Sequence, residues 1–138
     1  MLVEANGIPI GIALEGAHRH DCKLVEATLE TLVVTRPQPT ADSPQHLCLD
    51  KAYDSDAVRQ TVTDWGYTAH IRRRGEEKNE KQTIPGYRAR RWVVERTHSW
   101  MNRFRRLLVR WEKKVTNYAG MLHFACAFIA FRAAGFFG

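Results

Sequence analysis

Cysteine is scarce in this chain, and its three cysteines, Cys22, Cys48 and Cys126, lie far apart. No Cys-x-x-Cys pair occurs, so neither a disulfide framework nor a cysteine-based zinc site is expected. A long hydrophobic run is also missing, because the apolar stretch over 119–131 is shorter than the ~20 residues of a membrane span and contains His123. The first residues lack the basic segment and apolar run of a secretion signal. We therefore expect a cytoplasmic protein.

Acidic residues are rare in the second half of the chain. Residues 87–138 contain 11 Lys and Arg but 2 Asp and Glu, a net charge of +9, whereas residues 1–86 contain 10 and 13, a net charge of −3. This asymmetry favours a polyanion as the partner of the second half. A basic helix that only faces solvent explains the charge equally well.

Strands and helices alternate in the first half of the chain. Asn6-Gly7 predicts a hairpin turn between strands over 1–4 and 8–14, with Pro9 at an exposed position. Asp21 and Asp54 are the expected helix caps. The elements predicted after the hairpin are a helix over 21–34, a strand over 46–50, a helix over 55–65 and a strand over 67–71.

The second half is predicted to be helical after a mobile loop over residues 72–86. Helices are expected over 88–131, of which the first begins at Arg88 and runs for about 24 residues with an apolar stripe on one side. The stripe comprises Val93, Trp100, Phe104, Leu107 and Trp111. The last helix, over 116–131, is apolar nearly all round and should be buried. The length fits one domain over residues 1–138, of the α/β class.

Asp50 is the first candidate for chemistry, because it ends a short, mostly apolar strand. A carboxylate at the carboxyl end of a buried strand is held rigidly where α/β sheets bind ligands, as a hard divalent cation requires. An ordinary aspartate that caps a turn is the alternative.

Glu95 is the second candidate, as the only acidic residue among eight arginines between Arg88 and Arg110. On a helix, Arg91 lies four residues earlier and reaches the same face. An ionised carboxylate among arginines suits a metal ligand beside phosphates, although a surface ion pair is the alternative. Glu95 lies nearly opposite the apolar stripe.

A third group has metal-capable side chains but no partner cluster. His18, His20, Asp21 and Cys22 are too close together in sequence for an ordinary zinc site, and no second cluster completes them.

Taken together, the first two candidates carry a resemblance to a known family. The run 50–55, Asp-Lys-Ala-Tyr-Asp-Ser, resembles the second-carboxylate motif of bacterial insertion-sequence DDE transposases of the four/five group, and residues 16–21 resemble a connector before it. The run 92–97, Trp-Val-Val-Glu-Arg-Thr, followed by residues 100–107, resembles the stretch around the third carboxylate. The family's tyrosine and lysine positions hold Arg88 and Asn102, with Tyr87 and Arg103 adjacent.

The resemblance implies an RNase H-like mixed sheet flanked by helices. It also implies DNA cleavage and strand transfer by three carboxylates and two Mg²⁺ or Mn²⁺ ions. Asp50 and Glu95 would be catalytic residues and metal ligands. Side chains that would hold DNA phosphates are Arg91, Arg103, Arg105 and Arg106. The basic residues over 72–74 are a further candidate for DNA contact.

The family's first Asp lies on a strand before the hairpin, and no such strand is present in residues 1–138. Asp21 follows the hairpin and cannot replace it by topology. We therefore expect an N-terminally truncated, partial catalytic domain that is inactive alone. The alternative is a non-catalytic fragment that binds DNA or dimerises, by itself or with a full-length transposase.

Overall fold

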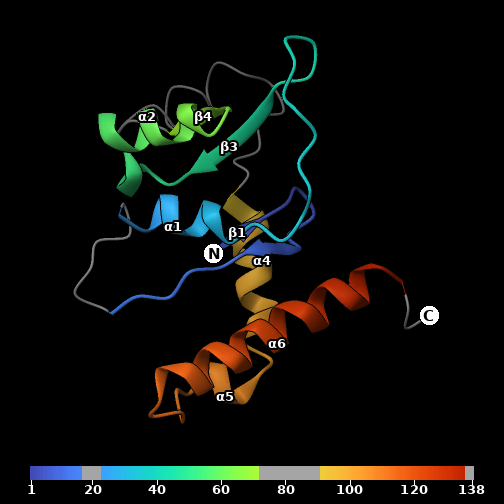
Figure 1. Cartoon of the computed structure of the whole chain (residues 1–138). Coiled ribbons are helices and arrows are strands. Elements are labelled where there is room, and N and C mark those ends of the chain that lie inside the picture. The colour runs from blue at the N-terminus through green and yellow to red at the C-terminus, as the bar shows by residue number, and fades with distance from the viewer. Residues whose placement is uncertain (17–22, 72–90, 136–138) are drawn as a thin grey trace, which may run out of the picture. The chain divides into compact units, whose positions relative to one another are not determined.

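The computed structural model describes residues 1–16, 23–71 and 91–135 (Figure 1). The chain divides into two compact units, each described here by itself. Unit 1 comprises residues 1–14, 28–34 and 91–138, and unit 2 comprises residues 15–27 and 35–90. The loop predicted over 72–86 and the predicted cap Asp21 lie outside the described residues.

Unit 1 begins with the predicted hairpin, in which β1 (Leu2–Val3) pairs antiparallel with β2 (Pro9–Gly11). The Glu4 carboxylate accepts hydrogen bonds from the backbone N–H groups of Asn6 and Ile8, at 2.7 and 3.0 Å, and so closes the turn. Gly7 has a φ of +83°, which a residue with a Cβ rarely adopts. The strands are shorter than predicted, and Pro9 is buried, not exposed.

The first helix, α1 (Leu24–Glu30), ends earlier than the sequence predicts. After it, the Thr31 hydroxyl donates to the Thr28 carbonyl at 2.7 Å, and the Val33 N–H donates to the Ile10 carbonyl at 3.1 Å. Thus Val33 bonds to the second hairpin strand and leaves the helical path. Gly11 allows this close approach, because a Cβ there would lie 3.0 Å from the Thr28 carbonyl oxygen.

The long helix predicted from Arg88 is wrong beyond residue 101. The chain forms α4 (Arg91–Met101), a turn, and the four-residue α5 (Arg105–Leu108). Phe104 is extended, with φ −86° and ψ 95°, and this break shifts the helical phase. The buried side of α4 is formed by Val93, Thr97 and Met101, at intervals of four. Trp111, predicted to continue the apolar stripe, is 72% exposed.

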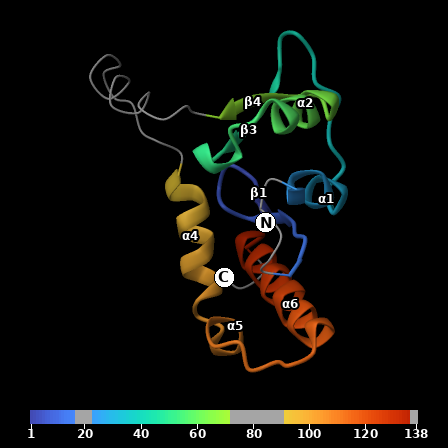
Figure 2. The ribbon, with the colours of Figure 1, turned by 90° about the vertical axis from the view of Figure 1, so that its left-hand side faces the viewer.

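The last helix, α6 (Val115–Ala133), is present as predicted but is not buried all round. Its residues Leu122, Ala125 and Ile129 pack with Met101 into the core of unit 1. The opposite side is open among the described residues, so that Phe124 is 59% exposed. Figure 2 shows α5 beside the first turns of α6, and the two helices are in contact. None of the helices in the described part of the chain has the length and apolarity that crossing a bilayer requires.

Unit 2 contains a parallel strand pair joined by a helix. β3 (Gln45–Leu49) and β4 (Tyr67–Ile71) run in parallel, and α2 (Asp56–Asp64) connects them, close to the prediction. Val58 and Val62 of α2 are buried, and α2 packs against β4. Gly66, with a φ of +75°, ends the helix and returns the chain into β4.

The hairpin turn of unit 1 is fixed to α4 by one buried residue. Thr97 is 0% exposed, and its hydroxyl lies 2.6 Å from the Gly7 carbonyl oxygen and 3.1 Å from the carbonyl oxygen of Val93. A Cβ on Gly7 would lie 3.0 Å from the Thr97 hydroxyl oxygen and 3.2 Å from the Val93 carbonyl oxygen. Only glycine therefore satisfies both the turn conformation and the approach of the turn to the helix.

We predict that Gly7→Ala lowers the free energy of unfolding by at least ~2 kcal/mol, because it adds left-handed backbone strain to a steric clash. Chemical denaturation followed by circular dichroism measures this change. The control is Gly120→Ala in α6, where no atom lies within 4 Å of the added Cβ. This variant should be neutral or more stable by about 0.4–1 kcal/mol. Equal stability of the two variants would show that the turn does not dock on α4.

Candidate functional site

Asp50 directly follows β3, at the edge where the two parallel strands end. The strand register pairs Leu49 with Ile71, which is the last residue of β4. Ile71 is buried, whereas Asp50 is exposed. Open α/β sheets bind ligands beyond the carboxyl ends of their strands. Asp50 therefore lies where a ligand-binding carboxylate is expected.

The backbone around Asp50 is held by a short turn. The Asp50 carbonyl accepts a hydrogen bond from the Tyr53 N–H at 2.9 Å, which begins the 3-10 turn η2 (Lys51–Tyr53). The Asp50 carboxylate makes no capping hydrogen bond. Its main chain is thus held in place, and no hydrogen bond or ion pair to another described residue engages its carboxylate.

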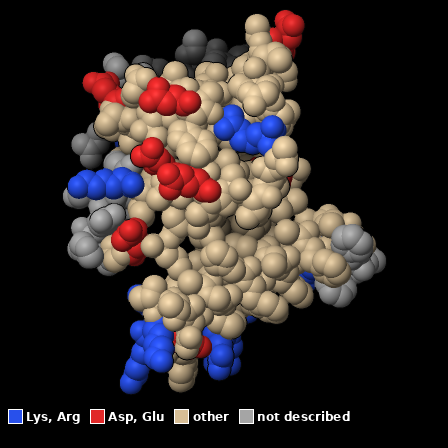
Figure 3. Space-filling view, viewed as in Figure 1, with Lys and Arg blue, Asp and Glu red and all other residues tan. Residues whose placement is uncertain are grey.

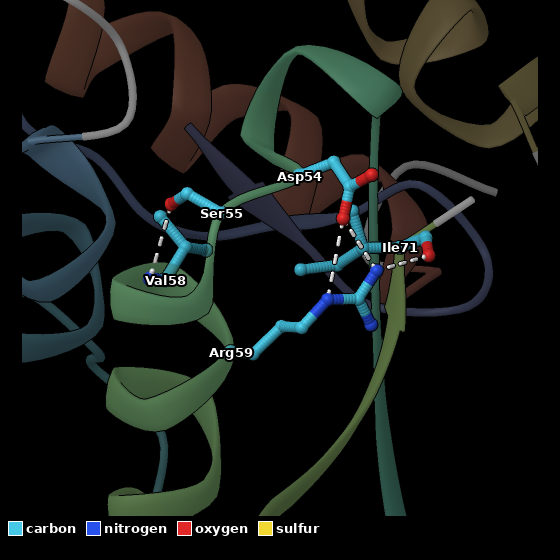
Figure 4. Close-up of polar contacts among 5 residues, drawn as sticks. All are labelled: Asp54, Ser55, Val58, Arg59 and Ile71. Atoms are coloured by element: carbon cyan, nitrogen blue, oxygen red, sulfur yellow. Dashed lines mark hydrogen bonds and ion pairs between the residues drawn. The ribbon is translucent and has the colours of Figure 1, made fainter. Parts of the chain in front are cut away.

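Arg59 joins the segment after Asp50 to the end of β4 (Figure 4). Its guanidinium donates to one Asp54 carboxylate oxygen from Nη2 at 2.6 Å and from Nε at 3.2 Å, and Nη2 also donates to the Ile71 carbonyl at 2.9 Å. This brace connects the turn that follows Asp50 with the neighbouring strand end. The pair was not predicted from the sequence, because Asp54 precedes the helix and falls outside the three- and four-residue spacings of helical pairs.

Ser55, not Asp54, caps α2. The Ser55 hydroxyl oxygen accepts a hydrogen bond from the Val58 N–H at 3.3 Å (Figure 4). Asp54 stands one residue earlier and uses its carboxylate for the ion pair with Arg59. The prediction of Asp54 as the cap was therefore wrong by one residue, because both residue types favour the capping position.

Glu95 belongs to α4 of unit 1 and is exposed. It stands on the helix surface between the buried positions Val93 and Thr97 and points away from them, as its exposure requires. Among the described residues no hydrogen bond or ion pair engages the Glu95 carboxylate. Its chemistry and that of Asp50 fit a hard divalent cation, which prefers carboxylate oxygens.

Arg96 fastens the same helix to the hairpin. Its guanidinium lies over the rings of Trp92 and Trp100, at 4.6 and 5.1 Å from their centroids, and donates to the Asn6 carbonyl oxygen. The Nε atom is buried and has no hydrogen-bond partner among the described residues. From the sequence alone, Arg96 and Thr97 were noted only as neighbours of Glu95 in the family motif. The structure gives both a role in fixing the helix that bears Glu95.

The arginines predicted to hold phosphates are not equivalent. Arg103, in the turn after α4, and Arg105, in α5, are exposed. Arg106 is 66% exposed, but its Nη1 lies 3.4 Å from the half-buried Glu112 carboxylate. Arg91 begins α4, and its side chain lies outside the described part of the structure. Arg105 is thus the member of α5 whose charge no described acid compensates.

Basic side chains gather around α5 and the start of α6. Figure 3 shows Lys and Arg at the lower edge of the molecule, where these elements lie in Figure 1. We call this set the basic surface, and it comprises the exposed residues Arg103, Arg105, Arg106, Arg110, Lys113 and Lys114. Much of the positive charge of the second half is therefore concentrated on one short segment of unit 1.

A ready-made metal site, with or without Asp50 and Glu95, is absent from the described part of the chain. No group of three or more His, Cys, Asp or Glu side chains is arranged to hold a metal ion within residues 1–16, 23–71 and 91–135. The cluster of His18, His20, Asp21 and Cys22, and the basic residues over 72–74, lie outside these ranges. Burial raises the pKa of the Cys126 thiol, which disfavours the thiolate form.

The cavity of unit 2 lies at the opposite end of the strand pair from Asp50. It has a volume of about 440 Å³ and is lined by Arg36, Trp65 and Gly66, among others. Arg36 donates to the Gln45 side chain and the Trp65 carbonyl, and it lies 3.8 Å from the ring centroid of Tyr67. Burial raises the pKa of Tyr67, and Arg36 opposes the rise. Through these contacts Arg36 links its own segment to Gln45 at the start of β3 and to Trp65 and Tyr67 near the start of β4.

Comparison with known proteins places the chain in a family. The family model described as a transposase DDE domain matches residues 47–132, a segment that includes Asp50 and Glu95. A protein named as a transposase for insertion sequence element IS402, from Burkholderia cepacia, is 30% identical over 131 residues. The chain therefore belongs to the DDE transposases of insertion sequences.

The relatives differ in how much of their length the chain spans. The match covers 94% of this chain but 60% of the Burkholderia protein. A protein named as a transposase for insertion sequence element IS6501, from Brucella ovis, is 28% identical over 136 residues, which cover 95% of each chain. No solved structure matches this chain significantly.

Proposed function

We propose that this chain is part of an enzyme that cleaves and joins DNA strands during transposition of an insertion sequence of the four/five group, in the cytoplasm. The observation that carries the proposal is the position of Asp50, an exposed carboxylate directly after β3 where two parallel strands end. The family membership and the exposed Glu95 within the matched segment support the same reaction.

We infer that unit 2 contributes to an RNase H-like mixed sheet. Its two parallel strands with α2 between them form a β-α-β unit, the element from which such sheets with flanking helices are built. In this proposal residues 1–138 form part of a catalytic domain, and α4, α5 and α6 are its C-terminal helices.

Asp50 and Glu95 are proposed as ligands of the same pair of Mg²⁺ or Mn²⁺ ions. Both carboxylates are exposed, and the elements that carry them are braced, by Arg59 in one case and by Arg96 and Thr97 in the other. Bound ions of this kind neutralise phosphate charge and activate the attacking oxygen. The protein's own contribution is to hold the two carboxylates in fixed positions and to align the DNA backbone.

The arginines supply that alignment in our proposal. Arg91, Arg103, Arg105 and Arg106 would pair with phosphate oxygens, which position DNA without reading its sequence. Because Glu112 compensates part of the charge of Arg106, we expect Arg105 to contribute more to DNA affinity.

A second function is favoured by a specific observation. Within residues 1–138 we assign two of the three carboxylates that the reaction requires. The basic surface does not depend on any of these carboxylates. A chain with this surface alone can bind DNA, or pair with itself or with a full-length transposase, without cleaving DNA. Cleavage assays separate the two functions.

We predict that the 138-residue chain does not cleave DNA carrying the ends of its element in the presence of Mg²⁺. Two carboxylates do not fix two divalent ions as three do, and a misplaced ion loses the in-line arrangement of the attacking and leaving oxygens. An N-terminal extension that adds a β-strand with one aspartate should restore cleavage. Gel analysis of end-labelled DNA measures the products.

The same assay contains its controls. In the extended protein, Glu95→Gln and Asp50→Asn should each abolish cleavage, whereas Asp64→Asn, an exposed residue at the end of α2, should leave it unchanged. Cleavage by the 138-residue chain that persists in Asp50→Asn would contradict the proposed site.

We predict that the chain binds DNA with strong salt dependence and little sequence preference. The logarithm of the binding constant should fall with the logarithm of salt concentration by about 0.9 per neutralised phosphate. Arg105→Ala should weaken binding and flatten this slope more than Arg106→Ala. Fluorescence anisotropy with labelled DNA at several salt concentrations measures both quantities.

The matched control for this experiment is Arg132→Ala. Arg132 is also exposed but lies in the last turn of α6, at the far end of a helix about 28 Å long. The substitution Arg132→Ala removes one positive charge outside the basic surface, so the DNA affinity and the slope of its salt dependence should change little. An equal loss in Arg132→Ala and Arg105→Ala would mean that net charge, and not the basic surface, determines binding.

A further inference from the structure

Trp111 is the most exposed aromatic side chain in the described part of the chain, at 72%. It lies between α5 and α6, in a segment without regular structure. The core of unit 1, formed by Met101, Leu122, Ala125 and Ile129, does not include it. An indole ring contributes to binding mainly by burying its faces, so this exposed ring is a candidate contact for a ligand.

The segment around Trp111 combines exposed apolar residues, among them Val109 and Val115, with several basic residues. Arg110 precedes Trp111, Lys113 and Lys114 follow it, and all three are exposed. The Arg110 guanidinium lies 5.2 Å from the ring centroid of Tyr118, which keeps that charge at the start of α6. The nearby acid Glu112 is paired with Arg106. Trp111 thus lies in the same chain segment as Arg110, Lys113 and Lys114 of the basic surface.

This combination of an open ring and exposed cations, of which Lys113 and Lys114 have no described acidic partner, restricts the ligand. An apolar partner would cover the indole but would also take several cations out of water, which is costly. A nucleic acid offers phosphates for the cations and a flat base for the ring, and base–aromatic stacking is largely independent of sequence. In a continuous duplex each base already stacks on its neighbours, so its faces are covered. An unpaired base leaves a face open.

We propose that Trp111 stacks on an unpaired base of DNA whose phosphates are held by the basic surface. The chain then prefers DNA with a single-stranded segment over blunt duplex of the same sequence. This inference rests on the proposed DNA-binding function and adds the class of DNA that the surface takes. The arginines of α5 provide affinity for both kinds of DNA, and Trp111 provides the preference.

The test compares the affinity of the 138-residue chain for a blunt duplex and for the same duplex with a single-stranded overhang, by fluorescence anisotropy. The wild type should bind the overhang DNA more tightly. Trp111→Ala should weaken that binding about tenfold, as expected for one base–aromatic stack, and should leave blunt-duplex binding nearly unchanged. Trp111→Phe keeps an aromatic face and should retain most of the preference.

The matched control is Phe124→Ala, which removes another exposed aromatic, 59% exposed, from the middle of α6. It should alter neither affinity. Circular dichroism checks that every variant is folded, and Trp111→Phe remains informative if the alanine variant is not.

Three outcomes would overturn the inference. An equal loss on both DNAs in Trp111→Ala would make the residue a general contact, with the proposed DNA binding intact. A loss of self-association in sedimentation, with the DNA preference unchanged, would assign the ring to a second copy of the chain. Failure of the wild type to bind either DNA would remove the proposed DNA binding and this inference together.

Discussion

The hydrogen bond from the Thr97 hydroxyl to the Gly7 carbonyl is the contact on which the arrangement of unit 1 depends. It joins residues 90 positions apart and is buried. It requires that residue 7 has no Cβ, because a Cβ there would crowd the Thr97 hydroxyl. The same close approach lets Arg96 reach the Asn6 carbonyl. The hairpin and α4 are thereby held as one piece, and the last turn of α4 adds Met101 to the core formed with α6. Glu95 projects from one side of α4, and the residues on the opposite side, Val93, Thr97 and Met101, are buried.

Unit 2 holds its carboxylate by a different means. Asp50 follows a strand, so the parallel ladder between β3 and β4 fixes the direction of the backbone up to Leu49. Beyond Leu49, Arg59 holds the backbone in place, because it donates hydrogen bonds both to Asp54 and to the carbonyl of Ile71, the last residue of β4. Both proposed ligands thus stand on rigid backbone with exposed side chains, the arrangement that metal binding without large reorganisation needs. Neither brace uses the carboxylate that we propose as a ligand.

Local signals predicted the elements of unit 2, and the hairpin and α6 of unit 1, but they failed at the break between α4 and α5. The apolar run before Asp50, the cap region near Ser55 and the stop at Gly66 each depend on neighbouring residues, and the strands and helix formed there as expected. In unit 1 the apolar residues keep their helical spacing through the break at Phe104. A single long helix was therefore predicted where the chain forms α4 and α5. Two of the positioning residues, Arg59 and Arg96, were missed because their hydrogen-bond acceptors follow no helical spacing. The acceptors of Arg59 lie five residues earlier and twelve residues later, and the Asn6 carbonyl that Arg96 reaches lies 90 residues away. The candidate carboxylates could be named from the motifs, but the contacts that hold them depend on tertiary structure.

We propose that Asp50 and Glu95 bind the same metal ions, and paramagnetic broadening by Mn²⁺ tests this proposal most directly. Amide signals of the labelled protein are followed during a Mn²⁺ titration, in the wild type and in Asp50→Asn. Signals around residues 50–54 and 93–97 should broaden with one common midpoint, and Asp50→Asn should weaken the broadening at both places. Broadening near residue 95 that is unchanged in Asp50→Asn, or broadening confined to one of the two segments, would contradict a shared site.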